Sequence, residues 1–148
     1  MQAKKRSPTP SAANSGSKQP EPLTLFLDES LDSLSVVTAL RDAGATIVRY
    51  TERFQQRGLP DEVWLGECGK NDWVALTRDK RVRYRQLERL ALYAAKVRAF
   101  VFTGGNVTAV DTGAILCRAL DRIRRICRVN PGPFIYHIGK SGRPVKMD

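Results

Sequence analysis

The segment Leu23-Thr-Leu-Phe-Leu-Asp28 joins a compact apolar run to an acidic residue. Two later segments also bring an acidic residue next to an apolar run: Asp61 opens Asp61-Glu-Val-Trp-Leu directly after Pro60, and Asp79 follows Trp73-Val-Ala-Leu-Thr-Arg. Short apolar runs of this kind are typical of buried strands, and proline suits the first turn of a helix. The sequence therefore predicts acidic residues where two strands end and where one helix begins.

Strand and helix patterns alternate along the rest of the chain. Apolar runs predict five strands, at residues 25–27, 46–50, 73–76, 98–102 and 134–138. Apolar residues at helical spacing predict helices at residues 34–40, 60–68, 87–94 and 116–127, the second of which Gly69 is expected to end. This alternation favours an α/β fold, a three-layer α/β/α sandwich around a mainly parallel sheet of about five strands.

The two ends of the chain differ in composition from its middle. Residues 1–22 are basic, contain several Ser and Pro and show no apolar periodicity, which predicts a disordered basic N-terminal tail. Residues 23–139 are expected to form one domain, because 148 residues suffice for one core and not for two. Residues 140–148 are expected to form a C-terminal tail. No apolar run could span a bilayer and no secretory signal is visible, so we expect no membrane association.

The composition narrows the classes of function. A formal net charge of +10 attracts polyanions such as nucleic acid, an anionic membrane surface or an acidic protein. The three cysteines form no C-x-x-C pair, so we expect buried, reduced thiols and a cytoplasmic protein. The single histidine, His137, has no Cys or His nearby in the sequence, which argues against a zinc site.

The acidic residues predict a site at one edge of the sheet. Ligands of parallel sheets bind beyond the carboxyl ends of the strands, where Asp28 and Asp79 are expected. Mg²⁺ and Mn²⁺ prefer oxygen ligands and retain several waters, so two to four carboxylates suffice to hold one ion. Such an ion neutralises a phosphodiester and lowers the pKa of a bound water, which can then attack in line. A basic protein with this site is most simply interpreted as a nuclease.

The segments around Asp28, Asp61 and Thr77-Arg-Asp79 together resemble the PIN-like domains, and among these the branch that contains VapC-type toxins of toxin–antitoxin systems. The resemblance extends over residues 23–139. It implies a PIN-like α/β/α fold and a metal-dependent endoribonuclease, the toxin of a type II toxin–antitoxin system, with Mg²⁺ or Mn²⁺ as the cofactor. The partners that it implies are RNA and a cognate antitoxin protein, and a homodimer is compatible with it.

Carried over residue by residue, the resemblance implies that Asp28, Asp61 and Asp79 are the catalytic metal ligands. Many PIN-like domains have a fourth acid at the end of the fourth strand, where this chain has Thr103-Gly-Gly-Asn106, so a second metal position stays open. The secondary ligand candidates are Glu29, Glu62 and Asp111. The supporting candidates are Thr77, Thr103 and Asn106. The candidates for contact with RNA phosphates are Lys80, Arg81, Arg83 and Arg85.

Other interpretations of these residues stay open. Each of the three acids could merely cap or begin a helix, a position that Asp favours. A relative with this fold could bind RNA without cleaving it. A response-regulator receiver domain has a similar order of residues, for which Asp28-Glu29, Asp79, Thr103 and Lys140 would stand. Against the receiver interpretation, such a domain has no use for Asp61, and Asp79 lies later than a strand-end phosphoacceptor should.

Overall fold

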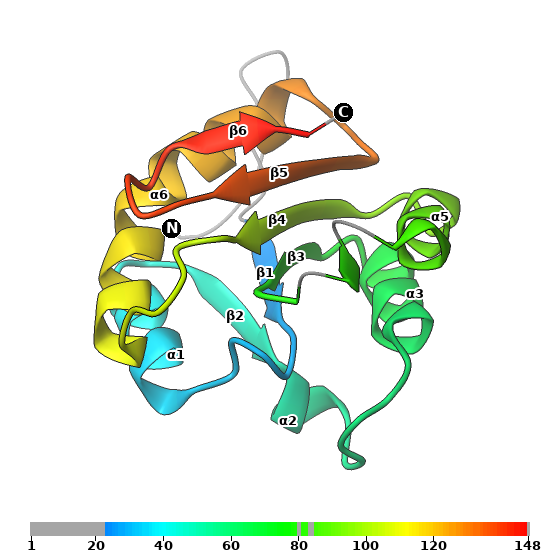
Figure 1. Ribbon diagram of the computed structural model, residues 1–148, viewed down its shortest axis with the longest axis horizontal. Helices are drawn as coiled ribbons and strands as arrows, with labels where there is room; N and C mark the ends of the chain where they lie inside the picture. Colours follow the sequence, from blue (N-terminus) through cyan, green and yellow to red (C-terminus); the bar gives the residue numbers. More distant parts are fainter. Residues whose placement is uncertain (1–22, 80, 83–84, 148) are drawn as a thin grey trace, which may run out of the picture.

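The computed structural model describes residues 23–79, 81–82 and 85–147 of the chain. A six-stranded sheet forms its centre, in the order β2-β1-β3-β4-β5-β6 (Figure 1). The strands are β1 (Thr24–Leu27), β2 (Thr46–Arg49), β3 (Val74–Thr77), β4 (Arg98–Phe102), β5 (Phe134–Ile138) and β6 (Pro144–Lys146). The first five strands run parallel, and β6 is antiparallel to β5. The predicted mainly parallel sheet is confirmed.

Helices cover both faces of this sheet. The helices are α1 (Leu34–Asp42), α2 (Tyr50–Arg53), α3 (Asp61–Asn71), α5 (Gln86–Ala94) and α6 (Ala109–Val129). Helices α1 and α6 pack together on one face, and α3 packs with α5 on the other, which gives the three predicted layers. Strand β1 serves both cores because its side chains alternate: Leu25 and Leu27 enter the core beneath α1 and α6, whereas Phe26 enters the other one.

Helix α3 differs from its predicted form at its C-terminus. Gly69 does not end the helix, which continues to Asn71 and ends at Asp72 in a left-handed conformation with φ 58°. The glycine instead allows close packing, because a Cβ at Gly69 would lie 2.1 Å from the backbone oxygen of Ala95, directly after α5. The residue that looked like a stop signal therefore sets how closely α3 approaches the end of α5.

The predicted C-terminal tail contains a strand of the sheet. Residues 144–146 form β6, and the backbone N–H of Met147 continues the pairing by donating to the Ile135 carbonyl at 2.9 Å. Pro144 is tolerated because β6 is an edge strand, where a missing donor need not break a ladder. The predicted N-terminal tail, residues 1–22, lies outside the described residues.

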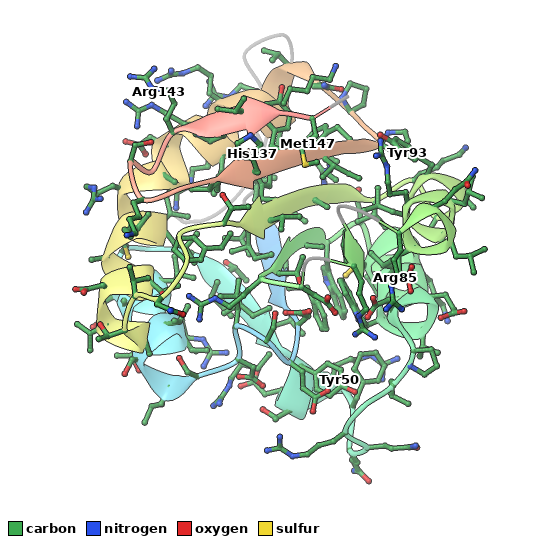
Figure 2. All side chains as sticks on the ribbon, in the orientation of Figure 1. Tyr50, Arg85, Tyr93, His137, Arg143 and Met147 are labelled. Carbon is green, nitrogen blue, oxygen red and sulfur yellow. The ribbon has the colours of Figure 1, made fainter. Side chains whose placement is uncertain are left out.

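Figure 2 shows His137 on the β5–β6 side of the molecule, well away from Tyr50 and Arg85. The three cysteines are free thiols; Cys68 and Cys127 are buried as expected, whereas Cys117 is only partly buried. Within the part of the chain that the structure describes, no helix combines the length and the apolar character that crossing a membrane requires.

Candidate functional site

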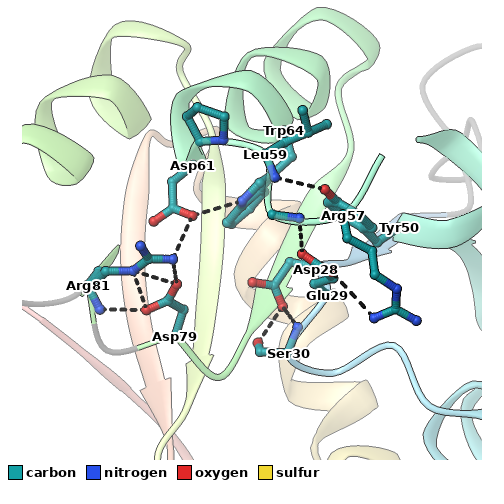
Figure 3. Close-up of a pocket in the computed structure, with 12 residues that line it drawn as sticks. Asp28, Glu29, Ser30, Tyr50, Arg57, Leu59, Asp61, Trp64, Asp79 and Arg81 are labelled. Atoms are coloured by element: carbon teal, nitrogen blue, oxygen red, sulfur yellow. Dashed lines mark hydrogen bonds and ion pairs between the residues drawn. The ribbon is translucent and has the colours of Figure 1, made fainter. Parts of the chain in front are cut away.

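A pocket of about 480 Å³ opens beyond the carboxyl ends of β1 and β3 (Figure 3). The chain leaves β1 through α1 toward β2, and leaves β3 toward β4 through α5 on the opposite face, so these neighbouring strands form a topological switch point. Crevices of α/β sheets that bind ligands lie at such points. The three acids predicted from the sequence, Asp28, Asp61 and Asp79, all line this pocket.

Asp28 follows β1 and is almost completely buried, with 3% of its surface exposed. Its Oδ1 accepts hydrogen bonds from the backbone N–H of Ser30 at 3.1 Å and from the Ser30 hydroxyl at 2.5 Å. Its Oδ2 accepts from the Thr77 hydroxyl at 2.6 Å. The side chain does not cap α1, because Ser33 is the N-cap of that helix. The cap interpretation is therefore wrong for Asp28.

Burial raises the pKa of Asp28 to about 7. The hydrogen bonds from Ser30 and Thr77 oppose this rise, whereas the negative charges of Asp79 and Asp61 add to it. A cation in the pocket would favour the charged carboxylate and lower the pKa again. The charged form of the buried Asp28 carboxylate would thus be stabilised by a neighbouring positive charge.

Thr77 is the last residue of β3 and joins two of the acids. Pairing of Leu27 with Leu76 in the parallel register brings the end of β3 beside Asp28, whose N–H donates to the Leu76 carbonyl at 3.2 Å. The Thr77 hydroxyl donates to Asp28 and accepts from the backbone N–H of Asp79 at 2.9 Å. The Thr-x-Asp spacing therefore fixes Asp28 and Asp79 relative to each other.

Asp61 is the first residue of α3 and is buried, with 4% of its surface exposed. Its Oδ1 accepts from the indole N–H of Trp64 at 3.1 Å, while its Oδ2 has no hydrogen-bond partner among the described residues. Burial raises the pKa of Asp61. A buried carboxylate oxygen without a partner is costly, so this atom favours a bound cation or a proton.

Asp79 is bound to Arg81 in the same segment. The backbone N–H of Arg81 donates to Asp79 Oδ1 at 2.9 Å. The guanidinium of Arg81 donates to Asp79 Oδ2 at 2.6 Å and to Asp61 Oδ1 at 3.5 Å. Burial alone would raise the pKa of Asp79, but the Arg81 hydrogen bonds hold it below its usual range. Among the described residues, no three Asp, Glu, His or Cys side chains converge closely enough to hold a metal ion as they stand.

The secondary ligand candidates have different surroundings. Glu29 lines the pocket, where its carboxylate accepts from the Gly58 N–H at 2.9 Å and lies 3.6 Å from the Arg57 guanidinium. It thereby holds the loop that leads to α3. Glu62 and Asp111 are exposed and lie outside the pocket lining. These two acids therefore do not lie in the pocket with Asp28.

Thr103 and Asn106 follow β4 and also lie outside the pocket lining. The Thr103 N–H donates to the Ile138 carbonyl at 2.8 Å, which ties this segment to β5. Lys140, which a receiver domain would need near the acids, is absent from the lining as well.

Among the RNA-contact candidates, Arg81 lines the pocket, Arg85 is exposed at the start of α5, and Lys80 and Arg83 lie outside the described residues.

Two residues that the sequence did not single out contribute to the site. Glu88, in the first turn of α5, lies near enough for its charge to raise the pKa of Asp61, and its Oε1 is buried without a partner among the described residues. The Tyr50 hydroxyl accepts from the Leu59 N–H at 3.2 Å and so positions the loop before α3. In the sequence, Glu88 is recognisable only as an acidic residue in the first turn of a predicted helix. The sequence pattern gives no indication that it lies near Asp61.

Comparisons with known proteins agree with this geometry. A family model described as "PIN like domain" matches residues 23–104, a stretch that contains all three acids. A protein of Mycobacterium tuberculosis (strain ATCC 25618 / H37Rv) named "Putative ribonuclease VapC45" is 28% identical over 120 residues, which cover 79% of this chain and 86% of that protein. No solved structure shows a significant match. The receiver interpretation is therefore wrong, and because the family model spans more than half of its residues, the chain belongs to the PIN-like domain family.

Proposed function

We propose that this protein is a metal-dependent endoribonuclease that hydrolyses RNA phosphodiester bonds. The observation that carries the proposal is that acids from β1, from α3 and from the segment after β3 line one pocket. Two of them, Asp28 and Asp61, are buried carboxyl groups, and Asp61 Oδ2 has no partner among the described residues. The similarity to a protein named as a ribonuclease supports RNA as the substrate class.

The residues fit a hard divalent cation, because carboxylate oxygens are the ligands that Mg²⁺ and Mn²⁺ prefer. The chemistry that a bound cation supplies here is neutralisation of the phosphodiester and a lower pKa of an attacking water. In this proposal Asp28, Asp61 and Asp79 hold the cation. Thr77 fixes Asp28 through its hydroxyl, and Trp64 fixes Asp61 through its indole N–H. Basic residues around the pocket bind the phosphates of the RNA strand.

Cleavage of labelled RNA in Mg²⁺ or Mn²⁺, with and without EDTA, tests the proposal. We expect Asp61→Asn to lower the rate at least about 100-fold, because the loss of a metal ligand exceeds the 10–100-fold effect of its supporting residues. Glu62→Gln is the matched control, since Glu62 is the next residue of α3 and is exposed. Cleavage that persists in EDTA, or in Asp61→Asn, contradicts the metal mechanism.

A second candidate is an RNA-binding protein that does not cleave. Two observations favour it: Arg81 pairs with Asp79 and Asp61, and the described residues contain no three-ligand cluster. The same assay separates the two functions when RNA binding is followed in parallel. An RNA complex that forms in Mn²⁺ and stays uncleaved supports this second candidate.

We further propose that the protein is the toxin of a type II toxin–antitoxin pair. The similarity to VapC45 supports this proposal. Expression in a bacterial host should arrest growth, and expression of Asp61→Asn should not. Relief of the arrest by the product of a neighbouring reading frame would identify the antitoxin, whereas equal growth with both forms of the protein contradicts the toxin role.

A further inference from the structure

We propose that Arg81 is the resident counter-cation of the acidic pocket: it occupies the space between Asp61 and Asp79 in the metal-free protein and competes with a divalent cation for these carboxylates. This inference rests on the proposed function. It concerns the state of the pocket before a metal binds, and it assigns Arg81 a role besides contact with RNA.

The position of the guanidinium supports this role. Arg81 Nη2 lies 2.6 Å from Asp79 Oδ2 and 3.5 Å from Asp61 Oδ1, so one group bridges acids that come from two different elements (Figure 3). Arg81 Nε adds contacts to both oxygens of Asp79, at 3.1 and 3.0 Å. A cation that binds Asp79 must therefore use an oxygen that Arg81 now contacts, whereas Asp61 still offers its Oδ2, which has no partner among the described residues.

The guanidinium of Arg81 does not provide partners for all of the carboxylate oxygens in its surroundings. Asp61 Oδ2 and Glu88 Oε1 are both buried without a partner among the described residues, although Arg81 Nη2 lies 3.5 Å from Asp61 Oδ1. The single charge of the guanidinium thus leaves a buried oxygen of Asp61 without a partner. A divalent ion carries twice the charge of a guanidinium in a smaller volume, and carboxylate oxygens can coordinate it directly. Both properties favour exchange of the guanidinium for the metal.

The departure of Arg81 leaves the acids in place. Asp61 retains its hydrogen bond from the Trp64 indole, and Asp79 retains the one from the backbone N–H of Arg81. The Arg81 side chain is 50% exposed, whereas that of Asp61 is 3% exposed, so the guanidinium can swing into solvent without repacking the core. The structure thus favours a competing role for Arg81 over a positioning role.

Arg57 provides the matched control. It lines the same pocket and carries the same charge, but its nearest acid is Glu29 at 3.6 Å, and its side chain is 84% exposed. Replacing Arg57 removes positive charge from the pocket without vacating the space between Asp61 and Asp79. It therefore separates a general effect of charge from occupation of the cation position.

Calorimetric titration of RNA-free protein with MnCl₂ tests the inference on wild type, Arg81→Gln, Arg81→Lys and Arg57→Gln. We expect Arg81→Gln to lower the Mn²⁺ dissociation constant about tenfold, and Arg57→Gln to change it by less than about twofold. Arg81→Lys should fall between wild type and Arg81→Gln, because Lys keeps the charge but loses the forked contact. Equal gains in Arg81→Gln and Arg57→Gln, or an unchanged or weaker affinity in Arg81→Gln, overturn the inference.

Thermal melting provides a second measurement that does not depend on activity. In EDTA, Arg81→Gln should melt below wild type, because Asp61 and Asp79 then repel each other without a counter-cation. Saturating Mn²⁺ should raise the melting temperature of Arg81→Gln more than that of wild type, whereas a loss that Mn²⁺ does not restore contradicts the exchange. If wild type cleaves RNA in Mn²⁺ but Arg81→Gln gains no affinity, only this inference fails. If none of the four proteins binds Mn²⁺ and wild type does not cleave, both proposals fail.

Discussion

The carboxyl group of Asp28 combines deep burial with three hydrogen bonds. Burial raises its pKa from the usual 3.8 to about 7. Between these values the folded chain binds more protons than the unfolded chain, so the free energy of unfolding falls as the pH rises from about 4 to about 7. A shift of this size corresponds to on the order of 4 kcal/mol.

Asp28→Asn should remove this pH dependence. In urea denaturation from about pH 4 to about pH 8 without divalent metal, the variant should gain stability relative to wild type as the pH rises, because its amide cannot lose a proton. Glu62→Gln introduces an amide at an exposed position and serves as the matched control. A flat difference for Asp28→Asn would show that the Asp28 carboxyl does not titrate in this window.

Thr77 holds Asp28 and Asp79 with one hydroxyl group, which donates to the first residue and accepts from the backbone of the second. Thr77→Val keeps the shape but leaves the buried Asp28 Oδ2 without its partner, at a cost of about 1–3 kcal/mol, and the partly buried Asp79 N–H loses its acceptor. RNA cleavage should fall about 10–100-fold, as for other residues that orient metal ligands. Thr77→Ser retains the hydroxyl and should keep most of the activity, and equal losses in both variants would count against the hydrogen-bonding role.

The three central acids of the site could be predicted from the sequence because they lie beside local signals. Asp28 and Asp79 follow buried strands, and Asp61 begins a helix after a proline. The pairing of Arg81 with Asp61 and the approach of Glu88 could not be predicted, because they depend on how α3 docks against the segment after β3 and against α5. These contacts are tertiary and leave no periodic pattern.

Among the elements, α3 contains two glycines with opposite surroundings. A Cβ at Gly69 would lie 2.1 Å from the Ala95 backbone oxygen, whereas a Cβ at Gly66 would have nothing within 4 Å. Gly69→Ala should therefore destabilise the protein by about 1–3 kcal/mol, because the backbones must separate. Gly66→Ala should stabilise it by up to about 1 kcal/mol, since Ala is the better helix former. Urea denaturation measures both, and similar effects of the two changes would contradict this packing.

The five parallel strands could be predicted because apolar runs mark them, but two short elements could not. Helix α2 has only four residues and follows β2 without a break. Strand β6 is a short, polar edge strand that forms by pairing with β5. Thr103 and Asn106 were expected near the acids because all parallel strands end at one edge. The strand order places the end of β4 two strand spacings, roughly 10 Å, from that of β1, which Asp28 follows.

At the scale of the whole molecule, a net charge of +10 surrounds a pocket lined by several acids. The positive field should supply much of the affinity for RNA, because phosphate contacts release bound counterions. The affinity for a single-stranded RNA should therefore fall about tenfold or more between 50 and 200 mM salt in the presence of EDTA. Fluorescence anisotropy measures this dependence, and an affinity that does not change with salt would exclude phosphate contacts as its main source.

The hydrogen bond from the Trp64 indole to Asp61 also gives the protein an optical probe of its own acidic pocket. Trp64 lies stacked at 5.9 Å from Phe26, and the second tryptophan of the chain, Trp73, lies on the same ring at 5.7 Å. In a Trp73→Phe background, the emission of Trp64 would report directly on the carboxylate to which its N–H is bound. Occupation of the pocket could then be followed in real time without a label, before any RNA is added.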